Sequence, residues 1–588
     1  MIHTTHIPVM GTSYTIDTPI RIAPFGIDST ISLVDNYLLE DLRAYYSRLY
    51  NLPYEPILRN EEDGCAKRVQ AYLDMVHTIV CRRFEEIRRL PFEKGNEKEK
   101  YFTLLPSAHA LRKGFESVLK MPLGAERSAL EASLNSQMYM GSIDVNLMVK
   151  LDYKNVAKDA LRGFAHSKIT NGAVVFSAGV NLGLFNDLVQ YSDFYRTKDG
   201  IKKRIILKIS DYRSALTQGK FLAKKGLEVS EFRVESGLNC GGHAFASQGM
   251  LLPLILEELK EKRESLSKTF YPLIQKYYDA QGMDSSVLDP DRDARFTVQG
   301  GIGNSGENRR MLEYYKVDGT GWGSPFLMVP EACLLDDYTL EILREAKRED
   351  LYLSDASPIG VPFNNTTRST ANAQRVKNIE AGSSGFPCVN GFLRLNTEFT
   401  EEPICTASIQ YQKLKIAQIQ GSDLSPEEKQ NAIKKVQAKE CICSHLGNPI
   451  RIAFGIVEAS KAPVSVCPGP GLAYFEGPYS LVQMMAHIYG DGPSLVPSDR
   501  PHLFAEEIRL YTEWFIKESK EATPEYAKWL HQAALNLYEN MDYCLNFAKT
   551  QEAFPGENLA SIGNAITLYR PQLEKAHEGL KAKHQNLS

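Results

Sequence analysis

The sequence has no long apolar run and no leader-like start. No stretch approaches the roughly 18 consecutive apolar residues that a membrane-spanning helix requires. The first residues, Met1-Ile-His-Thr-Thr-His6, show no charged segment followed by an apolar core. We therefore expect neither a membrane protein nor a secreted one, and no membrane partner. The expected location is cytoplasmic.

The sequence also lacks clusters of Lys and Arg and has few cysteines for its length. The chain carries 68 Lys and Arg residues against 72 Asp and Glu residues, a net charge of −4, with no strong basic block. Binding to nucleic acid needs clustered Lys and Arg to neutralise phosphates, so no nucleic-acid partner is expected. Ten cysteines in 588 residues are too few for a disulfide scaffold, and reduced thiols are expected. We also find no internal repeats and no low-complexity segments.

The central part of the chain alternates short apolar runs with helical patterns. Ala173–Ser177 and Arg204–Ile209 are continuously rather than alternately hydrophobic, which suits parallel strands buried on both faces. Strand, glycine loop and helix, repeated, predict a parallel α/β structure, either a TIM-like barrel or a doubly wound sheet. In both architectures the chemistry collects at the carboxyl ends of the strands.

Two glycine-marked loops follow neighbouring strands. Gly300 and Gly301 follow the run beginning at Phe296, and Gly323 and Ser324 end the next unit. Glycine lets backbone N–H groups approach an anion closely, and a helix N-terminus adds a favourable dipole, so these loops could form one phosphate site. The alternative is that the glycines only satisfy tight turns.

A histidine follows a third glycine pair, Gly241-Gly242. His243 ends a predicted strand and would lie at the same mouth. Imidazole titrates near neutrality and can move a proton to or from a substrate. The alternative is a loop histidine that only caps backbone groups.

These segments resemble a known family. Gly241-Gly242-His243, Gly300-Gly301-Ile302 and Asp318–Glu331 are similar to motifs of the flavin-dependent nitronate monooxygenases and of the related FMN-dependent enoyl-acyl-carrier-protein reductases. Pro19–Pro24 resembles the family's first strand, and Ile143–Met148 resembles its Val-Asn-Leu strand. The resemblance covers residues 15–50 and 140–345.

The resemblance implies a TIM-like (β/α)8 barrel that holds FMN through its glycine loops, Gly241 and Gly242 included. It assigns the FMN phosphate to Gly300, Gly301, Gly323 and Ser324, and the isoalloxazine lining to Ala23, Pro24 and Asn146. It makes His243 the catalytic acid or base. Three departures are visible: Phe25 stands where the family usually has Met, no Gly-Gly-Leu-Gly follows the first strand, and the second loop reads Gly-Trp-Gly-Ser-Pro rather than Gly-Thr-Arg.

The sequence divides into four predicted regions. Residues 1–31 and 141–346 would form the barrel, and 32–140 a helical insertion that either covers the active-site mouth as a lid or only packs against the barrel. Residues 347–500 are rich in Pro, Gly, Ser and Asn, and residues 501–588 are helical. Within the third region Asp355–Asn365 is a segment that could fold back over the mouth.

Half of the cysteines lie in the third region. They are Cys388, Cys405, Cys441, Cys443 and Cys467. Thiolates after loop prolines are typical ligands of an iron–sulfur cluster, and Cys441, Cys443, His445 and one more residue could bind zinc instead. The alternative is buried cysteines without a metal.

The sequence thus favours an FMN-dependent oxidoreductase of the nitronate monooxygenase type that acts on a nitronate or a similar carbon acid. An NAD(P)H-dependent reductase of enoyl acyl thioesters is the first alternative. A barrel that serves only as a scaffold or ligand-binding module is the second.

Overall fold

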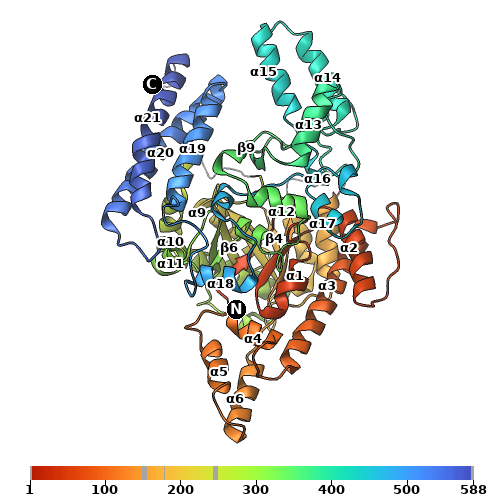
Figure 1. The fold of residues 1–588 in the computed structure, drawn as a ribbon, viewed down its shortest axis with the longest axis vertical. Helices are drawn as coiled ribbons and strands as arrows, with labels where there is room; N and C mark the ends of the chain where they lie inside the picture. Colours follow the sequence, from red (N-terminus) through yellow and green to blue (C-terminus); the bar gives the residue numbers. More distant parts are fainter. Residues whose placement is uncertain (1–2, 149–154, 178, 180, 243–248, 585–588) are drawn as a thin grey trace.

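The centre of the molecule is a closed barrel of eight parallel strands in chain order (Figure 1). The structure is a computed structural model that describes residues 3–148, 155–177, 179, 181–242 and 249–584. Each strand pairs with the next, and β8 pairs with β1. Closure confirms the TIM-like barrel and excludes the doubly wound sheet. The strands are β1 (Thr5–Ile7), β2 (Asp28–Ser32), β3 (Ile143–Leu147), β4 (Gly172–Phe176), β5 (Lys203–Ile209), β6 (Val229–Glu235), β7 (Arg295–Gln299) and β8 (Gly319–Gly321).

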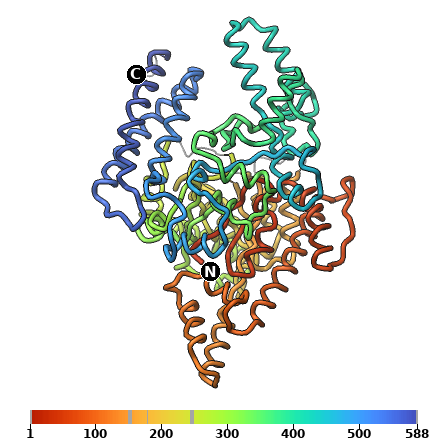
Figure 2. Tube along the Cα trace, viewed as in Figure 1, coloured from red at the N-terminus to blue at the C-terminus, as the bar shows by residue number. Residues whose placement is uncertain are grey.

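Helices surround the barrel and extend from it in three groups (Figure 2). The helices that follow β3 to β8 are α7 (Val156–His166), α8 (Leu182–Asp187), α9 (Tyr212–Ala223), α10 (Leu252–Gln281), α11 (Ser305–Arg309) and α12 (Asp337–Arg344). The helices before β3 are α1 (Thr18–Ile22), α2 (Asn36–Leu49), α3 (Gly64–Arg89), α4 (Glu97–Thr103), α5 (Ala110–Val118) and α6 (Ala125–Ser136). The later ones are α13 (Thr370–Glu380), α14 (Ile409–Gln420), α15 (Pro426–Gln437), α16 (Ile442–His445), α17 (Asn448–Ala453), α18 (Leu481–Tyr489), α19 (Leu503–Ser519), α20 (Pro524–Thr550) and α21 (Ala560–Lys583).

The segment expected to be the first strand is helical. Pro19–Pro24 forms most of α1 and the start of the short 3-10 helix η1 (Ala23–Phe25). The first barrel strand is Thr5–Ile7, which is only three residues long and lies outside the stretch that resembled the family. Pro19 stands in the first turn of α1, where a missing N–H costs nothing, so it favours a helix start there.

A charged layer fills the amino-terminal half of the barrel interior. Arg233 Nε donates to Glu231 Oε1 at 2.8 Å, and the Thr297 hydroxyl donates to the same oxygen at 2.6 Å. Burial raises the pKa of Glu231, but the positive charges of Arg233 and Arg295, with His6, outweigh it and lower that pKa to about 2. The carboxylate is therefore held ionised inside the barrel.

Polar residues also lie at the carboxyl ends of the strands, beyond an apolar layer inside the barrel. Val175 and Ile206 belong to a small apolar cluster inside the barrel. Two residues later on the same strands, Ser177 and Lys208 lie on the same side, because strand residues have a two-residue period. The apolar layer thus separates the charged interior from the carboxyl-terminal mouth.

The helical insertion lies along the outside and at the amino-terminal end of the barrel. Helix α3 packs on α7 and on η1, and α4–α6 project from the bottom of the view in Figure 1. The ammonium of Lys100 on α4 lies 5.0 Å from the centre of the Phe25 ring in η1. The limits of the four regions remain predictions.

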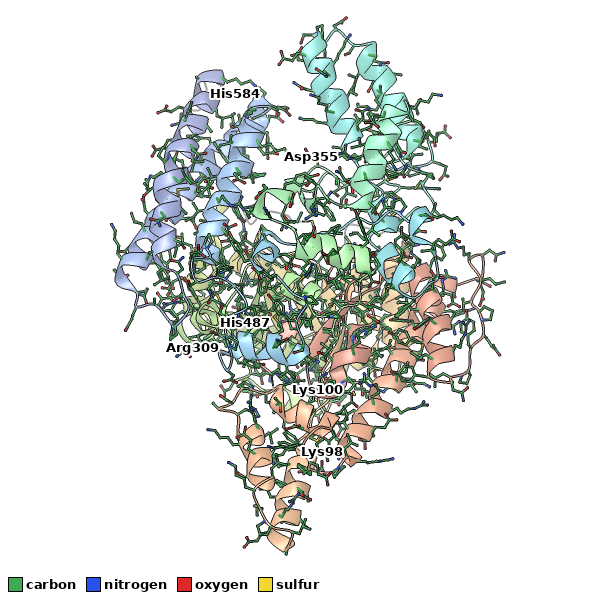
Figure 3. The ribbon with its side chains drawn as sticks, viewed as in Figure 1. Lys98, Lys100, Arg309, Asp355, His487 and His584 are labelled. Carbon is green, nitrogen blue, oxygen red and sulfur yellow. The ribbon has the colours of Figure 1, made fainter. Side chains whose placement is uncertain are left out.

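Two helical groups stand at the other end of the molecule. Helices α13–α15 form one group and α19–α21 the other, and Figure 3 labels Asp355 between them. Asp355 accepts two 2.8 Å hydrogen bonds from Lys517 of α19. It follows β9 (Leu351–Ser354), which pairs with β10 (Phe363–Thr366) in a small antiparallel sheet. Among the described residues, no helix combines the length and apolar character needed to cross a membrane.

Candidate active site

A cavity of about 180 Å³ lies at the carboxyl ends of the barrel strands. Its floor comes from β1 to β6 and the loops directly after them: Val9, Ser32, Asn146, Ser177, Lys208 and Glu235. This end of a parallel barrel collects side chains from several strands at one point. We call this cavity the mouth pocket.

The third region of the chain covers the mouth pocket. Ser357, Ile359, Val361 and Phe363 line it, as the sequence predicted for the segment Asp355–Asn365. This segment is held to the loop after β6, because Gly242 forms a β-bridge with Phe363 and Asn364 N donates to Gly241 O at 3.0 Å. Further apolar walls are Leu393, Ile442 and Leu446. None of the described residues from 37 to 140 lines this pocket.

A lysine and a glutamate form an ion pair in the floor. Lys208 Nζ lies 3.0 Å from Glu235 Oε1. The same carboxylate oxygen accepts hydrogen bonds from Asn239 Nδ2 at 3.0 Å and from Gln299 Nε2 at 2.7 Å. Glu235 is thereby fixed in orientation at the edge of the cavity, and the Lys208 ammonium is placed against the pocket.

Asn146 offers a buried acceptor to the mouth pocket. Its side chain is almost fully buried, and its Oδ1 atom has no hydrogen-bond partner among the described residues. An unpaired buried carbonyl costs free energy, on the order of 1–3 kcal/mol. A ligand with a hydrogen-bond donor at this point would remove that cost.

A second, smaller hollow lies between the loops after β7 and β8. Its backbone walls are Gly300, Gly301, Gly303, Gly323 and Ser324, with Gly469 and Gly471 from the third region. Asn239 lines both this hollow, which we call the glycine hollow, and the mouth pocket, so the two adjoin. Ser324 starts the 3-10 helix η8 (Ser324–Met328), and its hydroxyl accepts a 2.8 Å hydrogen bond from Gly469 N.

The glycines of this hollow are needed for different reasons. Gly300 and Gly301 have positive φ values of 98° and 83°, and a Cβ on Gly301 would lie 2.6 Å from Leu238 Cδ1. The turn itself therefore requires glycine at both positions. Gly323 has a negative φ of −96°, and a Cβ there would meet its nearest neighbour, Met10 Sδ, at an ordinary 3.5 Å. At Gly323 the turn alone does not explain the glycine.

Arg500 supplies a positive charge to the glycine hollow. Its buried guanidinium donates to Gly301 O at 2.7 Å and to Glu307 Oε1 at 2.7 Å. Its Nε has no hydrogen-bond partner among the described residues. The plane packs against Gly303, where a Cβ would lie 2.2 Å from Arg500 Cζ. Backbone amides and a guanidinium together make a suitable anion site.

The structure brings most of the predicted site residues together. Asn146, Gly241 and Gly242 line the mouth pocket, and Gly300, Gly301, Gly323 and Ser324 line the glycine hollow. His243 lies outside the described residues.

Ala23 and Pro24 are placed elsewhere. Ala23 O accepts a 2.8 Å hydrogen bond from Gly141 N, just before β3, so η1 lies at the amino-terminal end of the barrel. This position is opposite to the mouth pocket, and the two residues cannot line a ligand there. The residues at the expected position are Val9, Gly11 and Thr12, which follow β1.

The expected metal site is not formed. Among the described residues, no group of three or more His, Cys, Asp or Glu side chains could hold a metal ion. The thiols of Cys388, Cys405, Cys441 and Cys443 influence one another's pKa, and the thiols of Cys467 and Cys240 influence each other's environment at the barrel mouth. His445 is buried, burial lowers its pKa to about 4, and its Nδ1 has no hydrogen-bond partner in the described part of the chain. The prediction of an iron–sulfur or zinc site finds no support.

Sequence reasoning missed Lys208, Glu235 and Arg500. The first two lie inside β5 and at the end of β6, and the two-residue alternation after Ile206 and Arg233 would have placed them at the mouth. Arg500 lies 199 residues after Gly301, and no local pattern links the two.

Comparisons with known proteins give only distant matches. No protein-family profile matches the sequence, and no curated protein does. Solved structures similar to the chain include FabK from Thermotoga maritima, with 12% identity, 62% of this chain and 80% of that chain covered, and a TM-score of 0.30. The enoyl reductase domain of MlnA from Bacillus amyloliquefaciens has 14% identity, covers 62% and 84%, and has a TM-score of 0.36. Nitroalkane oxidase from Streptomyces ansochromogenes has 11% identity, covers 83% and 96%, and has a TM-score of 0.33. Such values carry no argument, and the barrel rests on its strand pairing.

Proposed function

We propose that this chain is an FMN-dependent oxidoreductase, with the flavin ring in the mouth pocket and its phosphate in the glycine hollow. One observation carries the proposal: the mouth pocket and the glycine hollow adjoin, because Asn239 lines both of them. The first is largely apolar, as a flavin ring requires, and the second contains Arg500, as a phosphate requires. A phosphate site in the loops after the last two strands is the usual position in this barrel architecture.

The residues present fit FMN. Glycine loops let backbone N–H groups reach a phosphate, and Arg500 adds a fixed cation whose Nε–H has no partner among the residues that the structure describes. In the mouth pocket, Asn146 Oδ1 has no partner within the described ranges of the chain and would accept a hydrogen bond from a donor on the ring. Bound FMN would supply a two-electron carrier that exchanges a hydride with a substrate carbon.

The chain's own residues would exclude water from the site and would supply and remove protons. The segments that contain Phe363 and Leu393 would keep water out of the mouth pocket. Lys208 and Glu235 would hold a proton beside the reacting carbon, and His243, next to Gly242 in the sequence, stays the predicted acid or base.

The substrate we favour is a nitronate or a similar carbon acid, for which Lys208 would balance the negative charge. The apolar wall supports a second candidate, an enoyl acyl thioester reduced with NAD(P)H, because Val34, Met148, Ile359 and Val361 offer contacts for a hydrocarbon chain.

The test is flavin binding followed by turnover. Purified protein should carry or take up about one FMN per chain, since the two loops form one hollow. Flavin-loaded protein should then consume O₂ with an alkyl nitronate, or oxidise NAD(P)H with an enoyl thioester. Protein that binds no FMN at all would favour the non-catalytic scaffold and end the proposal.

A further inference from the structure

The connection between β6 and α10 forms one wall of the mouth pocket. Its described parts are residues 236–242 and 249–251. It directly follows Glu235, whose carboxylate pairs with Lys208 in the floor. Four of its residues line the cavity: Asn239, Cys240, Gly241 and Gly242. The position of this connection therefore decides where several polar groups of the pocket stand.

One buried carboxylate contacts both ends of this connection. Glu507 Oε1 on α19 accepts a 2.6 Å hydrogen bond from the Ser236 hydroxyl, at the β6 end. Its Oε2 accepts a 2.9 Å hydrogen bond from Leu252 N, at the start of α10, where the helix dipole favours a negative charge. Glu507 thus joins the carboxyl end of a barrel strand to the first turn of the next helix.

The Ser236 hydroxyl links Glu507 to the turn that contains Asn239. While it donates to Glu507, it accepts a 3.1 Å hydrogen bond from Leu238 N. Ser236 O accepts from Asn239 N at 3.1 Å, and Asn239 Nδ2 donates at 3.0 Å to Glu235 Oε1, the carboxylate oxygen of the floor ion pair. A continuous set of hydrogen bonds therefore runs from α19 to the floor of the mouth pocket.

Helix α20 contacts the other end of the connection as well. Asn540, which is fully buried, accepts a 2.9 Å hydrogen bond from Leu251 N. Gly249 lies so close to α20 that a Cβ there would be 2.7 Å from Ala533 O, and its φ is positive, at 82°. This contact therefore requires glycine. The C-terminal helices hold both ends of the segment that lines the pocket.

Glu507 is an expensive residue for this position. Burial raises the pKa of its carboxyl to about 6, hydrogen bonds from Ser236 and Leu252 lower it, and no cation of the described chain contributes. Burying a carboxylate without a cationic partner costs free energy, and an apolar side chain of similar volume would avoid that cost. A local violation of this kind is expected where a residue serves the site more than the stability of the fold.

We propose that Glu507 is a positioning residue of the candidate active site: it fixes the connection after β6 and thereby the positions of Glu235 and Asn239. Its effect on turnover rests on the proposed function, whereas its effect on the connection does not. Misplacing a group at the reacting atoms by about 1 Å can cost about 10²-fold in rate. Helices α19 and α20 are therefore part of the active-site structure and not a separate attachment.

Amide hydrogen exchange of the full-length protein, without flavin or substrate, tests the positioning itself. In Glu507→Leu, which keeps a side chain of similar size but no acceptor, the amides of residues 237–242 should exchange at least about tenfold faster than in the parent. Glu507→Gln should recover most of the protection, because its carbonyl can accept from Leu252 N and its amide can donate to the Ser236 hydroxyl. Ser236→Ala, which leaves α19 intact, should accelerate exchange as Glu507→Leu does.

Glu506 on the same helix provides the matched control. It is also buried, but its carboxylate pairs with Arg348 and Arg509 instead of contacting the connection. Glu506→Leu should therefore not accelerate exchange at residues 237–242 more than in the rest of the barrel. Parent-like protection of residues 237–242 in both Glu507→Leu and Ser236→Ala would overturn the proposal, and so would an acceleration spread evenly over all barrel strands.

Steady-state kinetics of samples matched for bound FMN test the consequence for turnover. Glu507→Leu and Ser236→Ala should lower kcat by about 10–100-fold with a smaller change in KM, and Glu507→Gln should restore most of kcat. An unchanged kcat in both variants would overturn the positioning role. If the parent protein binds no FMN, the proposed function fails, and the exchange experiment still decides whether Glu507 holds the connection.

Discussion

Arg500 Nη2 donates a 2.7 Å hydrogen bond to the carbonyl oxygen of Gly301, across 199 positions of the chain. The same guanidinium donates to Glu307 at the start of α11, so it is fixed on two sides. Arg500 comes directly before the C-terminal helices, and Leu503 N of α19 also donates to Glu307 Oε1 at 2.9 Å. The glycine hollow is thus completed by the segment that attaches these helices to the barrel.

Replacing this arginine should weaken phosphate binding selectively. In Arg500→Lys we expect FMN affinity to fall by about tenfold to a hundredfold, because a hydrogen bond to a charged group contributes about 1.5–3 kcal/mol. Riboflavin, which lacks the phosphate, should bind parent and variant alike. Fluorescence titration measures both, and Arg309→Lys, at an exposed position on α11, is the control. An equal loss for riboflavin would show that Arg500 acts on the fold and not on the phosphate.

The two glycine loops should respond differently to alanine. Gly301→Ala should lower stability, because φ is positive and the new Cβ would overlap with Leu238. Gly323→Ala should leave the melting temperature close to that of the parent, since its Cβ has room, yet it should reduce FMN affinity by narrowing the hollow. Thermal unfolding without ligand and FMN titration separate the effects. Unchanged FMN binding in Gly323→Ala would argue against a phosphate at this loop.

Much of the barrel could be predicted because its middle strands are continuous apolar runs. Ile143–Met148 and Arg204–Ile209 were expected as strands and are β3 and β5, with limits shifted by a residue. The first strand could not be recognised, since Thr5–Ile7 is three residues long and is stabilised by pairing with β2 and β8. Pro19–Pro24 has the composition of a strand but begins with a proline that also suits a helix.

The candidate site could be predicted only where its residues belong to local motifs. The glycine loops were visible because a turn leaves a sequence signature, and Asn146 because Ile143–Met148 resembles the Val-Asn-Leu strand of the family. The cover by Asp355–Asn365 was expected as a segment but without its contact residues, whereas the cation of Arg500 comes from a distant segment, and only the three-dimensional packing shows that it meets the glycine hollow. The cysteines were predicted as metal ligands because they follow loop prolines or form the Cys441-x-Cys443 motif, but such local patterns do not fix the distances between segments, and no metal-binding group is found among the described residues.

The ion pair in the floor should matter for turnover more than for flavin binding. In Lys208→Met we expect kcat to fall by about 10²–10⁴-fold if the ammonium balances charge or moves a proton, while FMN content stays near that of the parent. Steady-state kinetics with the accepted substrate gives kcat and KM separately. Lys202→Met, an exposed position just before the same strand, is the control. An unchanged kcat would limit Lys208 to a structural role.

His243 gives an independent check on proton transfer. His243→Ala should retain FMN and lose about 10²–10⁴-fold in turnover if the imidazole is the acid or base. The pH profile of kcat/KM should then lose the limb that belongs to this residue. If the variant keeps the parent rate while Lys208→Met does not, the lysine carries the proton; loss of flavin in the histidine variant would indicate a structural role.

The contact between Arg310 and Glu557 should make attachment of the C-terminal helices dependent on pH. Both side chains are buried, and Arg310 Nη2 lies 2.8 Å from Glu557 Oε2. Burial raises the pKa of Glu557, but hydrogen bonds from His502 and Arg310 outweigh it and lower that pKa from 4.5 to about 2. Because the folded pKa is depressed, the stabilisation is fully present above pH 4.5 and is lost as the pH falls towards 2.

Removing the carboxylate should therefore cost stability at neutral pH and less in acid. We expect Glu557→Ala to lower the free energy of unfolding by about 3–5 kcal/mol at pH 7, because it leaves Arg310 buried without its partner. The exposed pair Arg309–Glu313 on the same segment is the matched control, and Glu313→Ala should cost less than about 1 kcal/mol. Urea unfolding at pH 7, 4.5 and 3.5 should show the difference between parent and Glu557→Ala shrinking below pH 4.5. A difference that stays constant over this range would mean that Glu557 contributes through packing and not through its charge.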